Sequence, residues 1–460
     1  MNTDLSAQKK PDVPLVLITI VLFIVLAAVL FSTWLTLKST SFNQQFTTLA
    51  PPCTESNWPQ PHSINHTAQV GQSSSMIPSS QIPFLSYESD LAVTIANKSP
   101  IAITTGPSGS IYGLFMNDSK YYLAKTNDFF HWSLISKAVV PHGYEVTPGG
   151  DISVTSEGVI LISATRLADH QNSTIFVASF NGGITFQTVL NASLLAKPEN
   201  YTGIDTGPGS GFWHGIIETS NSYLFAGLYN PQGLVYRSEN GGRAWNLILN
   251  ASQGSDWHNE IHDLAVNPYN NFLYVTTDDE SGTNTNHSLL ISTDYGSHWV
   301  TIYNSLQGGA GLPLQLTPTT IGFLDNGSEV ALGLEGFWKS QFSHSIFLLK
   351  SNPHGCLAAE YWVAASSLSV DPFISWWMSP KNYSSVFVLT HENDPFPKLG
   401  VGLFVLSDKG GVSQIMSLSG QNVSNWYSIS FLQISGPSSM NSYGVLFNDN
   451  SHQYLAVVKL

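Results

Sequence analysis

Three stretches of this chain repeat one short pattern. The sequence reads RSENGGRAW over Arg237–Trp245, STDYGSHW over Ser292–Trp299 and SFNGGITF over Ser179–Phe186. In each, Asp or Asn follows a Ser by two residues, Gly follows that Ser by four, and an aromatic residue ends the pattern. Short apolar runs typical of β-strands lie directly before and after every copy. We therefore predict that the pattern forms the turn between two antiparallel strands.

The residue types in the pattern suit a turn. The Asp or Asn oxygen can accept hydrogen bonds from backbone amides of the turn, and Gly supplies a positive φ. The aromatic residue opens the next strand and buries a large surface beside it. We expect a structural role for Ser179, Asn181, Gly183, Ser238, Asn240, Gly242, Trp245, Ser292, Asp294, Gly296 and Trp299.

Three degraded copies begin at Thr126, Ser351 and Ser407, so six copies follow one another at spacings of 53 to 59 residues. A period of this length, with about four strands per repeat, is typical of a β-propeller. The final HQYLAVVKL is predicted to be the strand before a missing seventh turn. The outer strand that it lacks could come from Ser89–Ala96, which would close the ring. We predict an all-β, seven-bladed β-propeller, with six or eight blades as alternatives.

The pattern resembles the Asp-box, or BNR, repeat of sialidase-like propellers, over roughly residues 86–460. The resemblance implies that the motif lies at the blade periphery, on the face away from the ligand. A sialidase site of this family holds the substrate carboxylate with three arginines, a role that Lys fills poorly. The chain has only Arg166, Arg237 and Arg243, and only Arg166 could reach the ligand face. The F/Y-R-I-P motif of the family is also absent, so the resemblance is to the fold without the sialidase catalytic set.

Pro14–Leu37 contain no charged residue. As a helix this stretch would extend roughly 36 Å at ~1.5 Å per residue, enough to cross a bilayer. It is longer than the apolar part of a secretory signal, so we predict a retained transmembrane anchor. A cleaved signal and a buried core helix are the alternatives. Lys9 and Lys10 precede the segment and Lys38 alone follows closely, which places residues 1–13 in the cytoplasm and the rest outside.

Residues 38–85 are rich in Ser, Thr, Gln and Pro, and we interpret them as an extracellular stalk before a propeller at 86–460. Asn-x-Ser/Thr sequons beyond the anchor indicate glycosylation of at least some asparagines. The eleven sequon residues are Asn65, Asn97, Asn117, Asn172, Asn191, Asn200, Asn250, Asn286, Asn326, Asn382 and Asn422. Cys53 and Cys356 could form a disulfide in this oxidising location, with two separate thiols as the alternative.

Charged residues make up only 10 % of the chain, and the formal net charge is −14. A nucleic-acid partner requires a concentrated basic face, and no such run occurs, so this class is excluded. The hydroxyl-rich, weakly charged composition suits a surface exposed to acid, such as the envelope of an archaeal acidophile. We predict no cofactor.

In a propeller, the loops from outer to next inner strand and from second to third strand share one face. Here they correspond to 164–173, 199–215, 254–263, 276–287, 333–344 and 390–400, which are rich in carboxylates, histidines and tryptophans. We predict that ligand binding occurs on this face. The candidate ligand-binding residues are Arg166, Trp213, His214, Trp257, His258, His262 and Trp338.

Two carboxylates on this face could serve a glycoside hydrolase as acid and base or nucleophile, although solvated surface residues would look the same. The candidates are Asp205, Glu260, Asp263 and Glu335. Strand alternation would also place His258, Glu260 and His262 on one side, where they could bind a metal ion. His214 occupies the equivalent position to His262 one blade earlier, which favours a structural role instead.

The sequence therefore predicts a single-pass membrane protein that carries an extracellular propeller. We expect it to recognise an extracellular glycan or a cell-surface protein, or to organise the cell envelope. The alternative is a glycoside hydrolase of the sialidase-like superfamily, though not a typical sialidase, acting on an extracellular glycan.

Overall fold

The structure is a computed structural model of the whole chain, and it divides into two compact units, Met1–Thr47 and Thr48–Leu460. The described residues all belong to the second unit. They are 100–146, 152–166, 173–193, 216–228, 233–251, 259–267, 270–279, 287–310, 312, 314–334, 346–351, 357–363, 371–373, 385–391, 402–407, 412–417, 430–435, 442–448 and 453–459. The predicted anchor and stalk lie outside these ranges. Within them, no helix combines the length and the apolar composition needed to cross a membrane.

The described strands form seven antiparallel sheets. The first contains β1 (Ala102–Thr105), β2 (Ile111–Asn117), β3 (Lys120–Thr126) and β4 (Ser133–Ser136); the second β5 (Tyr144–Glu145), β6 (Ile152–Val154), β7 (Ile160–Arg166), β8 (Ser173–Ser179) and β9 (Gln187–Ser193); and the third β10 (Ile217–Glu218), β11 (Leu224–Gly227), β12 (Leu234–Ser238) and β13 (Asn246–Asn250). The fourth contains β14 (Asn259–Val266), β15 (Leu273–Asp279), β16 (Ser288–Ser292) and β17 (Val300–Asn304), and the fifth β18 (Pro318–Leu324), β19 (Glu329–Leu334), β20 (Ile346–Ser351) and β21 (Leu357–Val363), with a 3-10 turn η2 (Asp325–Gly327) after β18. The sixth contains β22 (Asp371–Phe373), β23 (Ser385–His391), β24 (Gly402–Ser407) and β25 (Val412–Ser417), and the seventh β26 (Ser430–Ser435), β27 (Ser442–Asn448) and β28 (Gln453–Lys459).

The six predicted motif copies begin where strands end. Thr126, Ser179, Ser238, Ser292, Ser351 and Ser407 are the last residues of β3, β8, β12, β16, β20 and β24. In every case, the strand that ends at the motif copy pairs antiparallel with the strand that follows it in the sequence. The hairpin turn is therefore confirmed at the copies that begin at Thr126, Ser179, Ser238 and Ser292, and the all-β prediction with it. At Ser351 and Ser407 the flanking strands pair in the same way, while the residues between them lie outside the described residues.

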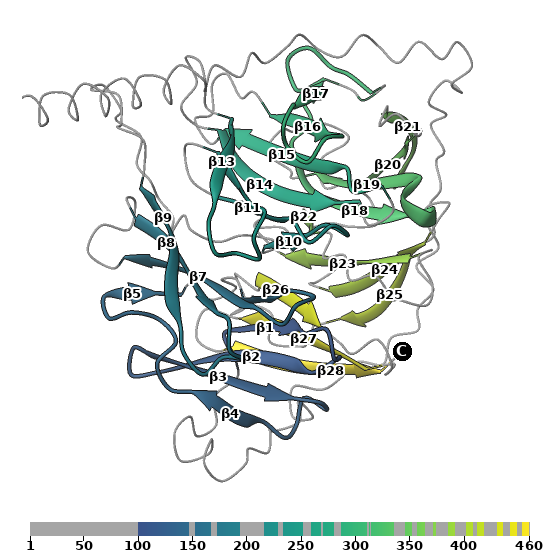
Figure 1. The fold of residues 1–460 in the computed structure, drawn as a ribbon. Helices are drawn as coiled ribbons and strands as arrows, with labels where there is room; N and C mark the ends of the chain where they lie inside the picture. The colour runs from purple at the N-terminus through teal and green to yellow at the C-terminus, as the bar shows by residue number, and fades with distance from the viewer. Residues whose placement is uncertain are drawn as a thin grey trace, which may run out of the picture. The chain divides into compact units, whose positions relative to one another are not determined.

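Contacts between sheets follow chain order. The inner strands β10, β14, β18 and β22 contact one another in succession, and β23 contacts β26. The second sheet joins the third through the Ile216 amide, which donates to Ser153 Oγ at 3.2 Å. β1 of the first sheet contacts both β6 and β26, and β26–β28 lie beside β1–β3 in Figure 1. Successive antiparallel sheets that meet through their inner strands are the arrangement of a β-propeller.

The described part of the seventh sheet has three strands, and the last is β28, which lies within the predicted final strand His452–Leu460. Its hydrophobic residues Leu446 and Leu455 pack with Ile103, Phe115 and Trp132 of the first sheet. Ser89–Ala96, the proposed fourth strand, lies outside the described residues. The first and seventh sheets therefore share a core.

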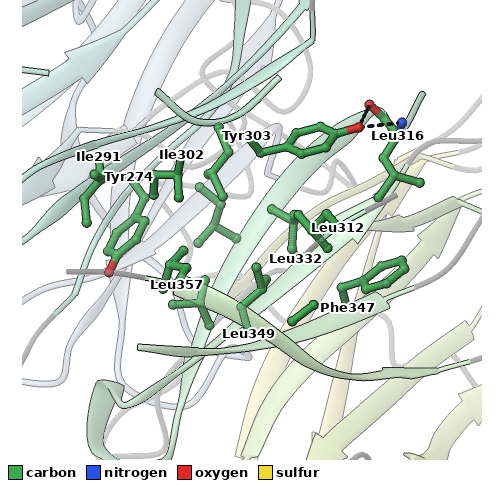
Figure 2. Packing of buried hydrophobic residues seen from close by; sticks show 14 of the residues in the cluster. Tyr274, Ile291, Ile302, Tyr303, Leu312, Leu316, Leu332, Phe347, Leu349 and Leu357 are labelled. Atoms are coloured by element: carbon green, nitrogen blue, oxygen red, sulfur yellow. Dashed lines mark hydrogen bonds between the residues drawn. The ribbon is translucent and has the colours of Figure 1, made fainter. Parts of the chain in front are cut away.

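The core consists of layers between neighbouring sheets, because central strands bury side chains on both faces. Figure 2 shows the layer between the fourth and fifth sheets, where Tyr274, Leu332 and Leu349 are among its members. The ring centroids of Tyr274 and Phe323 lie 5.3 Å apart, within the range of favourable aromatic pairs. Burial of Tyr274 raises its pKa to about 12, so its hydroxyl stays protonated near neutral pH.

Candidate functional site

The strand order makes the two ends of the strands in each four-stranded sheet unlike. These ends are distinct from the lateral edges of the sheet, which its outermost strands form. In an antiparallel meander, successive connections alternate between the two ends of the strands. The connections from first to second strand and from third to fourth strand, which include every motif copy, lie at one end, named here the turn edge. The connections from second to third strand and those to the next sheet lie at the other, the loop edge. The described strand ends that flank the six loops predicted to bind ligand all lie at the loop edge.

At the turn edge, the motif side chains bond within their own turn. Ser238 Oγ donates to Asn240 Oδ1 at 3.0 Å and accepts from the Gly242 amide at 2.9 Å. The Ala244 amide donates to the same Asn240 oxygen at 2.8 Å. The copies that begin at Ser179 and Ser292 make the same three bonds at 2.8–3.0 Å. These buried serines are thus satisfied locally.

The copy at Thr126 keeps the bond from hydroxyl to carboxylate but rearranges the others, because the amide four residues on donates to Asp128 and the Thr126 hydroxyl accepts from the Asp128 amide at 3.2 Å. Thr126 Oγ1 donates to Asp128 Oδ1 at 2.9 Å, in place of the Ser hydroxyl. The Phe130 and His131 amides donate to the same oxygen at 2.9 and 2.8 Å. Thr126 and Asp128 thus organise a turn here without the motif glycine, and Phe129 takes the positive φ.

Two copies add a histidine to the carboxylate. His131 Nδ1 lies 2.6 Å from Asp128 Oδ2, and His298 Nδ1 lies 2.5 Å from Asp294 Oδ2. Burial acts to raise the pKa of Asp294, but hydrogen bonds from the His298 side chain and amide and from Ser292 outweigh it and lower that pKa. The pKa of Asp128 is lowered in the same way, with burial opposed by bonds from its turn.

Two of the three arginines connect turns of neighbouring sheets. The Arg243 guanidinium lies over the Phe180 ring at 4.1 Å, a cation–π contact between adjacent motif copies. Arg237 Nη1 donates to the Tyr295 carbonyl at 2.7 Å in the next copy. Arg166 ends β7 at the loop edge, where its backbone pairs with Tyr144.

The turns between first and second strands also bond from sheet to sheet. Glu218 accepts from the Ser156 amide and hydroxyl, each at 2.6 Å. Asn271 accepts from the Ser220 amide and donates to its hydroxyl, both at 2.8 Å. Asn267 Nδ2 donates to the carbonyl of the last η2 residue at 2.8 Å. Four successive sheets are thus linked by side chains at the turn edge.

Most of the predicted site residues lie outside the described residues. These are Asp205, Trp213, His214, Trp257, His258, Glu335, Trp338, both cysteines and the sequon residues Asn65, Asn97, Asn172, Asn200, Asn286, Asn382 and Asn422. Their roles remain predictions.

Glu260 and His262 lie on β14 at the loop edge. Glu260 is opposite Asp278 of β15 in the strand register. The register shifts between Ile261 and Asp263, so His262 is the extra residue of a β-bulge. Simple alternation, which supported the metal hypothesis, is interrupted at this bulge. His262 is buried.

Asp263 connects two sheets. Its Oδ2 accepts from the Ile321 amide of β18 at 2.6 Å, and the residue is only 2 % exposed. A carboxylate placed on a backbone amide of the next inner strand positions that strand. Asp263 therefore has a structural partner, which makes it a weaker candidate for catalysis than the sequence indicated.

A band of buried polar residues lies at the loop edge where the fourth and fifth sheets meet, and the sequence indicated only the part of it that falls in the predicted loop 276–287. Its members include Thr276, Thr277, His287, Ser288, Asn304, Ser305, Thr317, Thr319 and Thr320. Thr276 Oγ1 donates to the Thr319 carbonyl at 2.9 Å, and Asn304 Nδ2 donates to Ser288 Oγ at 3.2 Å. Ser and Thr residues within strands do not indicate from the sequence that they will cluster, because only the fold brings them together.

The connection from β17 to β18 was missed as well. The Leu316 amide donates to the Tyr303 hydroxyl at 2.8 Å, which Figure 2 shows, and the Gln315 amide donates to the Ser305 carbonyl at 2.8 Å. Burial raises the pKa of Tyr303 to about 12. The same connection exposes Leu306 and Leu314, which are 57 % and 55 % exposed. This loop-edge segment is ordered by its own bonds and presents apolar surface.

Comparison with protein-family models and with curated proteins gives no match. Among solved structures, the chain is similar to "YCF48 bound to D1 peptide" at 12 % identity, covering 79 % of this chain and 95 % of that one with a TM-score of 0.43. It is similar to the GH74 enzyme of Niastella koreensis at 15 % identity, with 78 % and 55 % covered and a TM-score of 0.44. It is also similar to a PL25 ulvan lyase bound to a sugar ligand at 12 % identity, with 78 % and 93 % covered and a TM-score of 0.46.

Proposed function

We propose that this chain is a membrane-anchored, extracellular, seven-bladed β-propeller of the Asp-box type that recognises a glycan or a cell-surface protein through its loop edge. The contact between β1 and β26 supports closure of the seven sheets into a ring. The long uncharged stretch Pro14–Leu37, which we predict to be an anchor, and the sequons support the location.

The observation that carries the recognition proposal is the division between the two edges. The described motif residues and first turns at the turn edge are engaged in hydrogen bonds within and between sheets. The longer polar and aromatic connections are all attached to the loop edge. Loops on a rigid scaffold are where binding residues concentrate, so the loop edge is the better candidate surface.

A glycoside hydrolase is the second candidate, because Glu260 and Asp278 are opposite one another at the loop edge. Residues in such register have Cβ atoms about 4.5–5.5 Å apart, which puts the roughly 5–9.5 Å that separates the carboxyl groups of a glycoside hydrolase within reach of both side chains. Glycoside hydrolysis typically requires such a pair of carboxyl groups.

One screen separates the two candidates. The full-length protein in detergent is applied to a glycan array at neutral and acid pH, with retention and reducing-end release followed together. Retention without release supports recognition. Release that disappears in both Glu260→Gln and Asp278→Asn would replace the proposal with the hydrolase. If the array shows neither retention nor release, the arrayed glycans are excluded as ligands. Protein partners are then sought by crosslinking on intact cells.

A further inference from the structure

β9 has an exposed edge that lacks the usual protection. Among the described strands only β8 pairs with it, so it ends its sheet. Its sequence, QTVLNAS, contains no charged residue and no Pro. Gln187, Thr188 and Asn191 are exposed. Edge strands of this length offer unpaired backbone groups to another chain, and natural proteins block them with charges, Pro or a cover.

The strand carries its own candidate cover. Asn191, Ala192 and Ser193 form a sequon, with Asn191 exposed and Ala192 only 6 % exposed. Because side chains alternate along a strand, the Asn191 amide faces solvent. The same tripeptide recurs at Asn250, at the end of β13, which also ends its sheet. Both asparagines lie twelve residues after the first residue of their motif copy.

The next repeat provides an internal comparison. Asn304 occupies the same position but is followed by Ser and Leu, so it is not a sequon. It is only 8 % exposed, and its Oδ1 accepts from the Leu306 amide at 3.0 Å. An asparagine with a structural role at this position is thus buried and bonded, whereas Asn191 is exposed and lies within a sequon.

We propose that Asn191 carries an N-linked oligosaccharide that covers the free edge of β9 and prevents edge-to-edge pairing with a second copy of the chain. The half-buried Asn250 is the corresponding site on β13, with lower occupancy. In the modification, Asn191 Nδ2 forms a bond to the anomeric carbon of an oligosaccharide carried on a lipid phosphate. The bond from that carbon to the phosphate oxygen breaks, the phosphate leaves with its electron pair, and the amide loses one proton to a base of the transferase.

The test begins with the wild-type chain purified at full length from its native membranes. Mass spectrometry of the peptide containing Asn191 is expected to show an added mass equal to a whole number of monosaccharides. Ser193→Ala should lose that mass and Ser193→Thr, which restores the sequon, should keep it. An unmodified Asn191 in the wild-type protein overturns the proposal.

The covering role has a separate readout. In sedimentation velocity, S193A and wild-type protein freed of glycan by an endoglycosidase are expected to shift towards dimers and larger species, while S193T stays with the untreated wild type. Unchanged sedimentation after the glycan is lost overturns the covering role. The inference rests on the proposed extracellular location, which protease treatment of intact cells tests independently. If protease added outside the cells cleaves the propeller but Asn191 carries no glycan, this inference is overturned and the proposed extracellular location stands.

Discussion

At the scale of single residues, one hydroxyl organises each motif turn. The Ser238 hydroxyl donates to Asn240 and accepts from the Gly242 amide, and Ser238 is fully buried. Replacement by Ala leaves that amide without its partner in a dry environment. We expect Ser238→Ala to lower the free energy of unfolding by about 1–3 kcal/mol, measured by urea denaturation.

A matched control is Thr188→Ala on the exposed surface of β9, which should change stability by less than about 0.5 kcal/mol. Equal stability of S238A and T188A would show that the motif serine does not hold the turn.

The Asp294 turn should also depend on pH. Its carboxylate has a lowered pKa in the folded chain because bonds from His298 and Ser292 outweigh the effect of burial. Because the pKa of Asp294 is lower in the folded chain than its value near 3.9 in the unfolded chain, the ionised carboxylate stabilises the fold at pH values above about 3.9. This stabilisation is lost as the pH falls through the pKa of the folded chain. Asp294→Asn keeps an acceptor, as Asn181 and Asn240 do in their turns. The stability advantage of the wild type over D294N should therefore shrink as pH falls below about 4, as followed by thermal unfolding. A constant difference across that range would contradict this assignment.

The motif turns were predictable because their donors and acceptors lie within eight residues of one another. The copy at Thr126 looked degraded because its sequence is one residue shorter than the pattern. The hydroxyl of Thr126 still donates to the carboxylate of Asp128, which accepts from two amides of the turn. The presence of the hydrogen-bonding groups determines the turn more than an exact match to the sequence pattern.

At the scale of elements, the glycine four residues after the motif serine, which is Gly183, Gly242 or Gly296, lies against the preceding sheet. A Cβ on Gly183 would lie 2.7 Å from Leu123 Cδ2 and 2.9 Å from Ile135 Cγ2, whereas one on Gly182 would meet open space. Both glycines have positive φ. Gly182→Ala should therefore cost about 1–2 kcal/mol for strain alone. Gly183→Ala should cost a further ~1–3 kcal/mol for overpacking between sheets.

Urea denaturation of the two variants measures this difference directly. Equal destabilisation of G182A and G183A would mean that the turn does not pack against the neighbouring sheet.

Asp263 permits a second test at this scale, because it accepts from the Ile321 amide of the next inner strand. Asp263→Ala removes a bond to a charged acceptor and should lower the free energy of unfolding by about 1.5–3 kcal/mol. A D263A chain as stable as the wild type, yet altered in glycan release, would return Asp263 to the catalytic candidates.

Element pairing also explains what the sequence did not reveal. The bulge at His262 arises from the pairing of β14 with β15, which no local pattern shows. The uncharged connection after Tyr303 lacks the carboxylates, histidines and tryptophans that identified the other loops. Its order comes from bonds such as Leu316 to Tyr303. Strand order and turn positions were predictable from periodicity, whereas contacts between distant segments required the fold.

At the scale of the whole molecule, the turn edge holds the sheets together and the loop edge is the proposed recognition surface. The measurement that tests this division most directly compares retention on a glycan or cell-surface array for folded S238A, W257A and W338A, because Trp257 and Trp338 are predicted ligand-binding residues. We predict that S238A lowers the unfolding temperature but keeps wild-type retention, while W257A and W338A keep the unfolding temperature and lose retention. Loss of retention in folded S238A, with both loop-edge variants unaffected, would contradict the account.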